Sequence, residues 1–448
     1  MRTPPALFAA LLVSLCSLGC DNCGRPSRPV ECEKECFSGC RIAGLYACGR
    51  PCPAGTTERP NCEGGLDAAT DAPIDGAADA RADAPADAGT ICPRVPAPVD
   101  SIRRVVISHP FAESGGQDNR YEVLALSTSG ELTTGGPQFN LGRSTTGQIV
   151  FTPDGEVGLV AQTDGTLGVF RLDSAGAPTV VHAGFDGGFY AESVVVDPSG
   201  THALVLDAEW RDIGGGVYRV TIGCDGSLSD PQLVVPAKLP HGLALRGDRA
   251  LLAADDVLDS AAGQDAHLLE WGAAPRVIAS TAAFSDADAI VGGTALTHDG
   301  QYFLIGDNSA FSSSPNSVAV VQVSDAALSL VQTLSPIEDP LAIVASPFDD
   351  AAIVLSGFGD AIIRLERTAS GSMVFTNRDD LVYTGGRPQL PGGAAMIERG
   401  SLTGLVLVAE NIAVRRVRFE GGGAVTDLGA TVVGTGVAAV TGSIGVQP

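Results

Sequence analysis

The sequence predicts an all-β fold, a seven-bladed β-propeller that follows a small Cys-rich segment and an Asp/Ala linker. Three observations predict the propeller. A tight turn recurs along the chain, with its turn residue at positions 155, 200, 247, 300, 350 and 400. An aliphatic run of strand length, continuous or alternating, follows each turn. The turns lie 45 to 53 residues apart, which is about the period of a blade of four antiparallel strands.

Residues 1–19 have the pattern of a signal peptide. Arg2 is the only charge before the apolar run from Ala6 to Leu15, which is too short to span a bilayer. The run leads to Ser17-Leu-Gly-Cys20, which resembles the lipobox of bacterial lipoproteins, although that family usually has Leu where Ser17 stands. The resemblance implies that Cys20 is lipidated and becomes the mature N-terminus. Ordinary signal-peptidase cleavage is the alternative, and both predict export to the cell envelope.

Residues 20–64 are expected to form a small segment stapled by disulfide bonds. The chain has 11 Cys, of which Cys16 leaves with the signal peptide and eight lie in this segment. A segment of this size buries little core, and export favours disulfide bonds over zinc. The spacings Cys36–Cys40 and Cys48–Cys52 fit two short helices clipped together, and an irregular knot of loops is the alternative. Lipidation of Cys20 would leave one mature thiol unpaired.

Residues 65–91 are expected to form a disordered spacer. From Asp67 the chain runs through six four-residue units that each begin with Asp. The carboxylates repel one another, no large apolar residue is near, and Pro73 and Pro85 interrupt any helix. Fully extended, this stretch reaches about 80 Å. Such spacers are similar to those of other bacterial surface lipoproteins, so the propeller is predicted to be held off a membrane.

Residues 92–448 are assigned to the propeller, whose six turns give six blades. A seventh blade is predicted from the two ends of this region. Arg104–His109 and Tyr121–Leu126 fit the second and third strands of a blade that has no first strand, and Gly436–Val440 is a strand without a blade. A ring of blades has no free edge only where its ends meet, so the C-terminal strand is expected to complete blade 1. Six or eight blades are the alternatives.

The repeat, most clearly VFTPDGEVGLVAQTDGTLGVFRLDSAG from Val150, resembles that of the lactonase-like, YVTN-type seven-bladed propellers. The resemblance covers roughly residues 100–445 and implies the fold. It also implies, as one alternative, a lactonase-like hydrolase or isomerase activity. The leading expectation is a binding or scaffold module for an unknown protein or small molecule, because the sequence has no catalytic signature such as G-x-S-x-G or H-E-x-x-H.

The charge balance excludes one class of partner. Asp and Glu outnumber Lys and Arg 52 to 28, which gives a formal net charge of −24. A nucleic-acid binder needs clustered cations to displace the counterions of phosphate, and the sequence has no basic run. Contact with a membrane is therefore expected only through the lipid anchor.

Polar residues just before the expected inner strands are candidates for ligand binding. They are Glu192, His241, Asp288, Asp339 and Arg387. Lactonase-like enzymes have His, Glu and Arg in comparable places, where they bind and protonate a ring-opened carboxylate. The resemblance implies these types of residue here and does not assign the roles to individual positions. The alternative is that these residues are polar because water surrounds them.

A second set of candidates lies at the ends of the second strands of the blades. Asp207, Asp255 and Asp307 end such strands, and Glu410 lies near the equivalent position in blade 7. Converging carboxylates suit Ca²⁺, which takes six to eight oxygen ligands, and no other cofactor is expected. The alternative is that each Asp binds amides of its own loop.

A disulfide bond between Cys92 and Cys224 is predicted because both lie beyond the spacer and neither has another nearby partner. Cys224 is expected on the face opposite the funnel mouth of the propeller. The alternative is a free thiol at Cys224, with Cys92 joined to the N-terminal segment.

Overall fold

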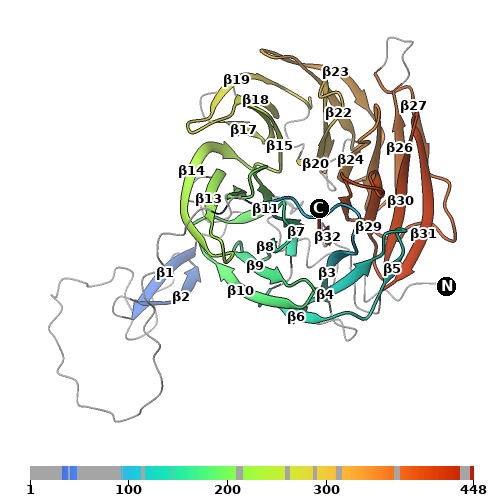
Figure 1. The fold of residues 1–448 in the computed structure, drawn as a ribbon. Coiled ribbons are helices and arrows are strands. Elements are labelled where there is room, and N and C mark those ends of the chain that lie inside the picture. Colours follow the sequence, from blue (N-terminus) through green and yellow to red (C-terminus); the bar gives the residue numbers. More distant parts are fainter. Residues whose placement is uncertain are drawn as a thin grey trace. The chain divides into compact units, whose positions relative to one another are not determined.

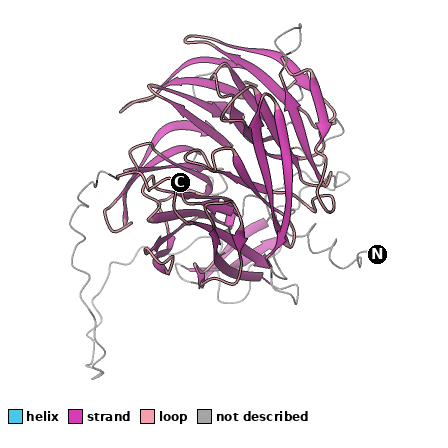
Figure 2. Ribbon diagram, turned by 45° about the vertical axis from the view of Figure 1, so that its right-hand side comes forward, coloured by secondary structure: helices cyan, strands magenta, loops and turns pink. Residues whose placement is uncertain are grey.

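In the computed structural model, the described part of the chain consists of residue 92, residues 94–111, 117–143, 145–207, 215–257, 263–285, 290–308, 315–367, 374–433 and 444–448, and two strands nearer the N-terminus. The described residues form strands and loops (Figure 2). No helix among them is long and apolar enough to cross a membrane. The chain divides into two compact units, Met1–Ala86 and Asp87–Pro448.

The described residues of the first unit form one antiparallel hairpin of β1 (Glu33–Ser38) and β2 (Arg41–Ala47). Strands therefore stand where a pair of short helices was one of two expectations. Of the seven residues of β2 (RIAGLYA), only Ile42 and Tyr46 are of types enriched in strands, so local propensity does not account for the hairpin. The predicted signal peptide, the lipidated Cys20 and the spacer lie outside the described residues.

The second unit is a seven-bladed β-propeller, in which seven antiparallel sheets surround a central axis (Figure 1). In six of the sheets the strands run outward from the axis in chain order, and blade 1 is the exception. Blade 2 consists of β7 (Thr145–Phe151), β8 (Val157–Gln162), β9 (Leu167–Leu172) and β10 (Pro178–Phe185). Blade 3 consists of β11 (Ala191–Val196), β12 (His202–Asp207), β13 (Gly216–Ile222), β14 (Leu228–Lys238) and the short β17 (Asp256–Val257) at its outer edge.

The next four blades repeat this order. Blade 4 has β15 (Gly242–Arg246), β16 (Arg249–Ala253), β18 (Ala266–Glu270) and β19 (Arg276–Thr281). Blade 5 has β20 (Val291–Leu296), β21 (Tyr302–Asp307), β22 (Val318–Val323) and β23 (Leu328–Leu334). Blade 6 has β24 (Pro340–Ala345), β25 (Ala351–Ser356), β26 (Ala361–Glu366) and β27 (Asn377–Asp380). Blade 7 has β28 (Gly393–Met396), β29 (Leu405–Ala409), β30 (Ala413–Gly421) and β31 (Ala424–Val432).

Blade 1 is assembled from both ends of the propeller region, as predicted. It consists of β32 (Ile444–Val446), β3 (Arg103–Phe111), β4 (Gln117–Leu126) and an outer strand in two pieces, β5 (Leu132–Thr133) and β6 (Gln138–Asn140). The innermost strand is not the predicted Gly436–Val440, which lies outside the described residues. Ile444 of β32 pairs with Ile107 and is fully buried, so burial places the closing strand a few residues further on.

The core of the propeller lies between the blades. Seven clusters of buried apolar residues occur, one at each interface between neighbouring blades. Successive residues of one strand point to opposite faces of its sheet. Leu159 of β8 therefore packs against blade 3, and Val160 packs against blade 1. The second strand of a blade is covered on both faces by the neighbouring blades. Its sequence is therefore a continuous aliphatic run, such as VGLVAQ, and does not alternate between apolar and polar residues.

The antiparallel order defines two faces of the propeller. The front face carries the loops that lead into the innermost strands and the loops that join second to third strands. The rear face carries the turns that join first to second strands and third to fourth strands. Gly155, Gly200 and Gly300 occupy rear turns with φ between +68° and +73°, a conformation that glycine adopts without strain.

Candidate functional site

The central channel of the ring is a candidate site. It encloses a cavity of about 570 Å³ to which the innermost strands of all seven blades contribute. Small residues make this convergence sterically feasible. A Cβ atom on Gly293 of β20 would lie 2.5 Å from Cα of Ala342 in β24, and one on Gly242 would lie 2.1 Å from Oγ1 of Thr294. The glycines before and within the innermost strands therefore let neighbouring backbones approach closely.

Polar side chains lie at both ends of this channel. Glu192, His241 and Asn308 line it toward the front face, Ser193 and Thr294 line it further inside, and Glu398 lies at the rear end. Backbone and aliphatic groups make up most of the remaining wall. Polar groups that converge on a concave wall are a usual feature of small-molecule sites.

His241 is neutral at physiological pH. It directly precedes β15, where its backbone N–H donates to the carbonyl of Ala253 at 3.0 Å. The residue is half-buried, its Nε2 atom is closed off from solvent, and that atom has no hydrogen-bond partner. Burial lowers the pKa of His241 to about 4, because the charged imidazolium loses its hydration. His241 therefore presents a neutral ring to the channel.

The structure places two of the polar residues predicted before the inner strands in one cavity and places others outside it. Glu192 and His241 line the same cavity. Arg387 does not line it, because its guanidinium pairs with Asp380 at 3.0 Å and lies 5.8 Å from the ring of Tyr383. Asp288 lies outside the described residues. An arrangement of Glu, His and Arg around one pocket is therefore absent from the described residues.

Asp339 is buried and fixes a loop. Its Oδ2 accepts a hydrogen bond from the backbone N–H of Phe358 at 3.0 Å, and its backbone carbonyl accepts one from Gly357 at 3.0 Å. Its Oδ1 is buried without a hydrogen-bond partner. Burial, reinforced by the neighbouring charge of Glu338, raises the pKa of Asp339 to about 6 against the single opposing hydrogen bond. Asp339 thus joins the loop before β24 to the loop after β25.

Two of the acidic residues at the ends of second strands also hold loops of their own blades. Asp207 accepts a hydrogen bond from the backbone N–H of Tyr190 at 3.1 Å, and Glu410 accepts one from Gln389 at 3.4 Å. Asp307 is buried, and Asp255 lies 3.9 Å from the ammonium of Lys238. Within the ranges that the structure describes, no three His, Cys, Asp or Glu side chains gather as a metal ion would require.

Sequence reasoning missed two kinds of polar residue. Asn308 directly follows Asp307 and lines the channel, but nothing in its spacing distinguishes it from a loop residue. A buried ion cluster in blade 7 was also missed. Arg415 pairs there with Glu410 and, at 2.7 Å, with Asp427, and its guanidinium also donates to the carbonyl of Gly386 at 2.9 Å. The cluster fixes the front loop that precedes β28.

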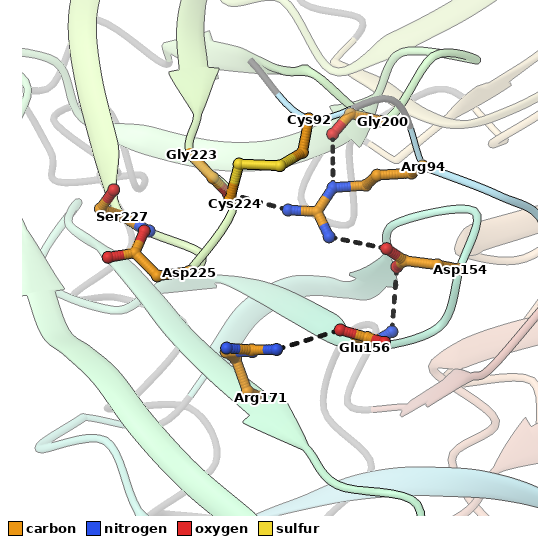
Figure 3. The surroundings of a disulfide bond; sticks show 10 residues. All are labelled: Cys92, Arg94, Asp154, Glu156, Arg171, Gly200, Gly223, Cys224, Asp225 and Ser227. Atoms are coloured by element: carbon orange, nitrogen blue, oxygen red, sulfur yellow. Dashed lines mark hydrogen bonds and ion pairs between the residues drawn. A yellow bond between two sulfur atoms is a disulfide. The ribbon is translucent and has the colours of Figure 1, made fainter. Parts of the chain in front are cut away.

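Cys92 and Cys224 are joined by a disulfide bond, the pair that the sequence predicts (Figure 3). Their Cα atoms lie 5.2 Å apart across a sequence separation of 132 residues. Cys224 stands in the rear turn between β13 and β14. Arg94 secures the same segment, with hydrogen bonds to the carbonyls of Gly200 and Gly223 at 3.0 and 2.9 Å. It also pairs with Asp154 at 2.8 Å, so the segment is fastened to blades 2 and 3.

Comparison with known proteins shows similarity in structure alone. No protein-family model matches the sequence, and no curated protein matches it. Among solved structures, a putative 6-phosphogluconolactonase from Bacteroides uniformis is similar, with a TM-score of 0.55, 12% identity and coverage of 78% of this chain and 99% of that chain. A protein from Lactobacillus plantarum has a TM-score of 0.55 at 12% identity, over 77% of this chain and 99% of that chain.

A periplasmic gluconolactonase from Pseudomonas aeruginosa is similar with a TM-score of 0.50 and 14% identity, over 75% of this chain and 97% of that chain. Identities this low establish the fold and leave activity open. The chain is a seven-bladed β-propeller whose fold is similar to that of lactonase-like propellers.

Proposed function

We propose that this protein is a binding module of the bacterial cell envelope that holds a small molecule in its central channel. The observation that carries the proposal is the cavity of about 570 Å³, walled by all seven blades, with polar side chains at both ends. Its volume lies within the range of about 300–1,000 Å³ typical of small-molecule sites. The bonds that fix the front loops, at Asp207, Asp339 and Arg415, would keep the mouth preformed.

The signal-peptide pattern and Ser17-Leu-Gly-Cys20 support an anchored location. The segment at Cys92 is fastened to the rear face, so a tether through the preceding residues would leave the front mouth open to ligands. The expected modification is a lipid on Cys20, detected by the intact mass of membrane-extracted protein. Cys20→Ala should move the protein to the soluble fraction, and an unmodified Cys20 in membrane-extracted protein would contradict the anchor.

Calorimetric titration tests the binding proposal. The probes are glucose, glucosamine, gluconate and D-glucono-1,5-lactone, which share one size and differ in charge. At least one should bind, and Ser193→Tyr, which fills the channel, should abolish the heat. Ser129→Tyr, in an exposed turn between β4 and β5, is the matched control and should bind normally. Binding that survives Ser193→Tyr would place the ligand elsewhere and refute the channel as the site.

Lactone hydrolysis is a second candidate function, because Glu192 and the neutral His241 line the same cavity. A neutral imidazole can take a proton from the water that attacks the lactone carbonyl and return it to the ring oxygen as the ring C–O bond breaks. Two of the similar solved structures carry gluconolactonase names. Arg387 cannot hold the product carboxylate from its place outside the channel.

Initial rates with D-glucono-1,5-lactone above the spontaneous rate test this function. Loss of one general base costs about 100-fold or more, so His241→Asn and Glu192→Gln should each lower the rate by that factor. Glu156→Gln, which removes a carboxylate from an exposed rear turn, is the control. Hydrolysis at the spontaneous rate by the folded wild-type protein would rule out this function on that lactone and leave the binding proposal standing.

A further inference from the structure

Residues 94–102 form a strap on the rear face of the propeller, the rear strap. The disulfide bond of Cys92 and the contacts of Arg94 fasten its start to the rear turns of blades 2 and 3 (Figure 3). The backbone N–H of Ala97 then donates to the carbonyl of Pro153, in the rear turn of blade 2, at 3.0 Å. The first half of the strap is therefore held by blades 2 and 3.

The second half of the rear strap is fastened to blade 7. Asp100 accepts a hydrogen bond from the backbone N–H of Ser401 at 3.2 Å. Arg103, which begins β3 and is 2% exposed, donates to the carbonyl of Val99 at 2.9 Å and to that of Arg399 at 2.7 Å. Arg399 and Ser401 lie in the rear turn between β28 and β29. Blades 2 and 7 are the two neighbours of blade 1, so the strap spans the blade in which the ends of the ring meet.

The contact that closes blade 1 without the strap is short. β32 pairs with β3 through three residue pairs, centred on Val106 and Gly445. A turn joins each of the other innermost strands to its second strand, whereas β32 comes from the far end of the chain. The guanidinium of Arg103 also donates to the carbonyl of Gln447, just after β32, at 3.1 Å. Arg103 therefore joins the rear strap, blade 7 and the closing strand at one point.

The disulfide bond at the start of the strap is within reach of a reductant. Cys224 is exposed and Cys92 is half-buried. A dithiol that reduces the bond passes two electrons to it: the sulfur–sulfur bond breaks, two thiols form and the dithiol closes into a cyclic disulfide. The strap then keeps only noncovalent contacts, those of Arg94 and Ala97, to blades 2 and 3.

We infer that the rear strap and its disulfide bond are a redox-controlled latch, which closes the ring a second time beside β32. With the bond formed, blades 2 and 3 are tied to blade 7 across blade 1. With the bond reduced, one end of the strap loses its covalent fastening, and β32 carries more of the closure. Disulfide bonds persist in oxidising compartments, so the latch is fastened where an exported chain would meet an oxidant.

Hydrogen exchange of the full chain, followed by mass spectrometry, tests the latch. Peptides from β3 and β32 report on the seam of the ring, and a peptide from β21 in blade 5 is the reference. The double substitution Cys92→Ser and Cys224→Ser, which fixes the reduced form, should speed exchange at the seam by about tenfold or more relative to the reference. Division by the reference removes the effect of a lower global stability, which speeds all peptides alike. Dithiothreitol should speed the seam of wild type in the same way and should not speed that of the double variant further.

Arg94→Met tests the strap with the disulfide bond intact, and it decides the question if the double variant does not fold. It should also speed the seam relative to the reference, whereas the control Arg171→Met, which removes the exposed ion pair with Glu156, should not. Equal acceleration of the seam and the reference would show a bond that stabilises the whole propeller without latching the ring. An unchanged seam would show that the strap has no part in closure. Either result would overturn the inference, and so would a further effect of dithiothreitol on the double variant.

Discussion

Replacing Asp339 with asparagine should change how the stability of the propeller depends on pH. The Asp339 side chain is almost fully buried, and one of its carboxylate oxygens has no partner. Asparagine keeps an oxygen for the N–H of Phe358 and tolerates the φ of +46° at this position. The substitution therefore removes the titrating group with little change in shape.

The sign follows from the two pKa values. The pKa of Asp339 is about 6 in the folded protein, and the value for an unperturbed Asp is 3.8. Between these values the folded state binds more protons than the unfolded state, so the free energy of unfolding falls as pH rises. Above pH 6 the loss is complete, and it amounts to roughly 3 kcal/mol because one pKa unit corresponds to about 1.4 kcal/mol. Asp339→Asn lacks this loss.

Urea unfolding of wild type and Asp339→Asn at intervals from pH 4 to pH 7.5 measures the effect. The stability of Asp339→Asn relative to wild type should rise by roughly 2.4 kcal/mol between pH 4 and pH 7, because part of the total change lies below pH 4. Contributions from other groups, including His241, cancel in the difference. Asp325→Asn, on an exposed turn between β22 and β23, should give a curve parallel to that of wild type. A difference between wild type and Asp339→Asn that stays constant with pH would refute the raised pKa.

Three further predictions concern the fold. Replacing both Cys92 and Cys224 by Ser should destabilise the propeller by about 4–5 kcal/mol in the loop-entropy model, measured by urea unfolding; a loss of less than about 1 kcal/mol would deny the bond any such role. Ending the chain after Val433 removes β32 and exposes the edge of β3, so the melting temperature should fall or the protein should aggregate. Removal of Pro448 alone is the control and should have no effect. A truncated protein that melts like the full chain would contradict closure by β32. Arg415→Met leaves two buried carboxylates without their cation and should cost about 3–5 kcal/mol, and an unchanged urea midpoint would contradict that role.

The blade repeat was predictable because it depends on local signals. Turn glycines and aliphatic runs of strand length mark the blades without knowledge of long-range contacts. Arg104–His109 and Tyr121–Leu126 form a blade that has no first strand, which predicts that a strand from the other end of the chain completes the ring. The closing strand was misplaced because Gly436–Val440 is a longer aliphatic run than Ile444–Val446. A three-residue strand with a central glycine is recognisable only from what it packs against, here Ile107 of β3.

The candidate site was less predictable, because it depends on which side chains the ring brings together. Glu192 lies at the start of an innermost strand and His241 directly before one, and both line the channel. Arg387 precedes one as well, but Asp380 and Tyr383 hold it outside. The position of a residue in the blade repeat determines whether it lies on the front or the rear face of the propeller. It does not show whether another side chain will hold that residue away from the channel. The acids at the ends of second strands show the same limit, since bonds such as that of Asp207 to Tyr190 involve the loop of the same blade.

The central claim is that the channel of the propeller holds the ligand. A crystal structure of the full chain soaked with the tightest-binding of the four probes tests this most directly. The account predicts electron density for the probe inside the channel, with polar contacts to Glu192 or His241. Density for the probe at any other place, with the channel filled only by water, would contradict it.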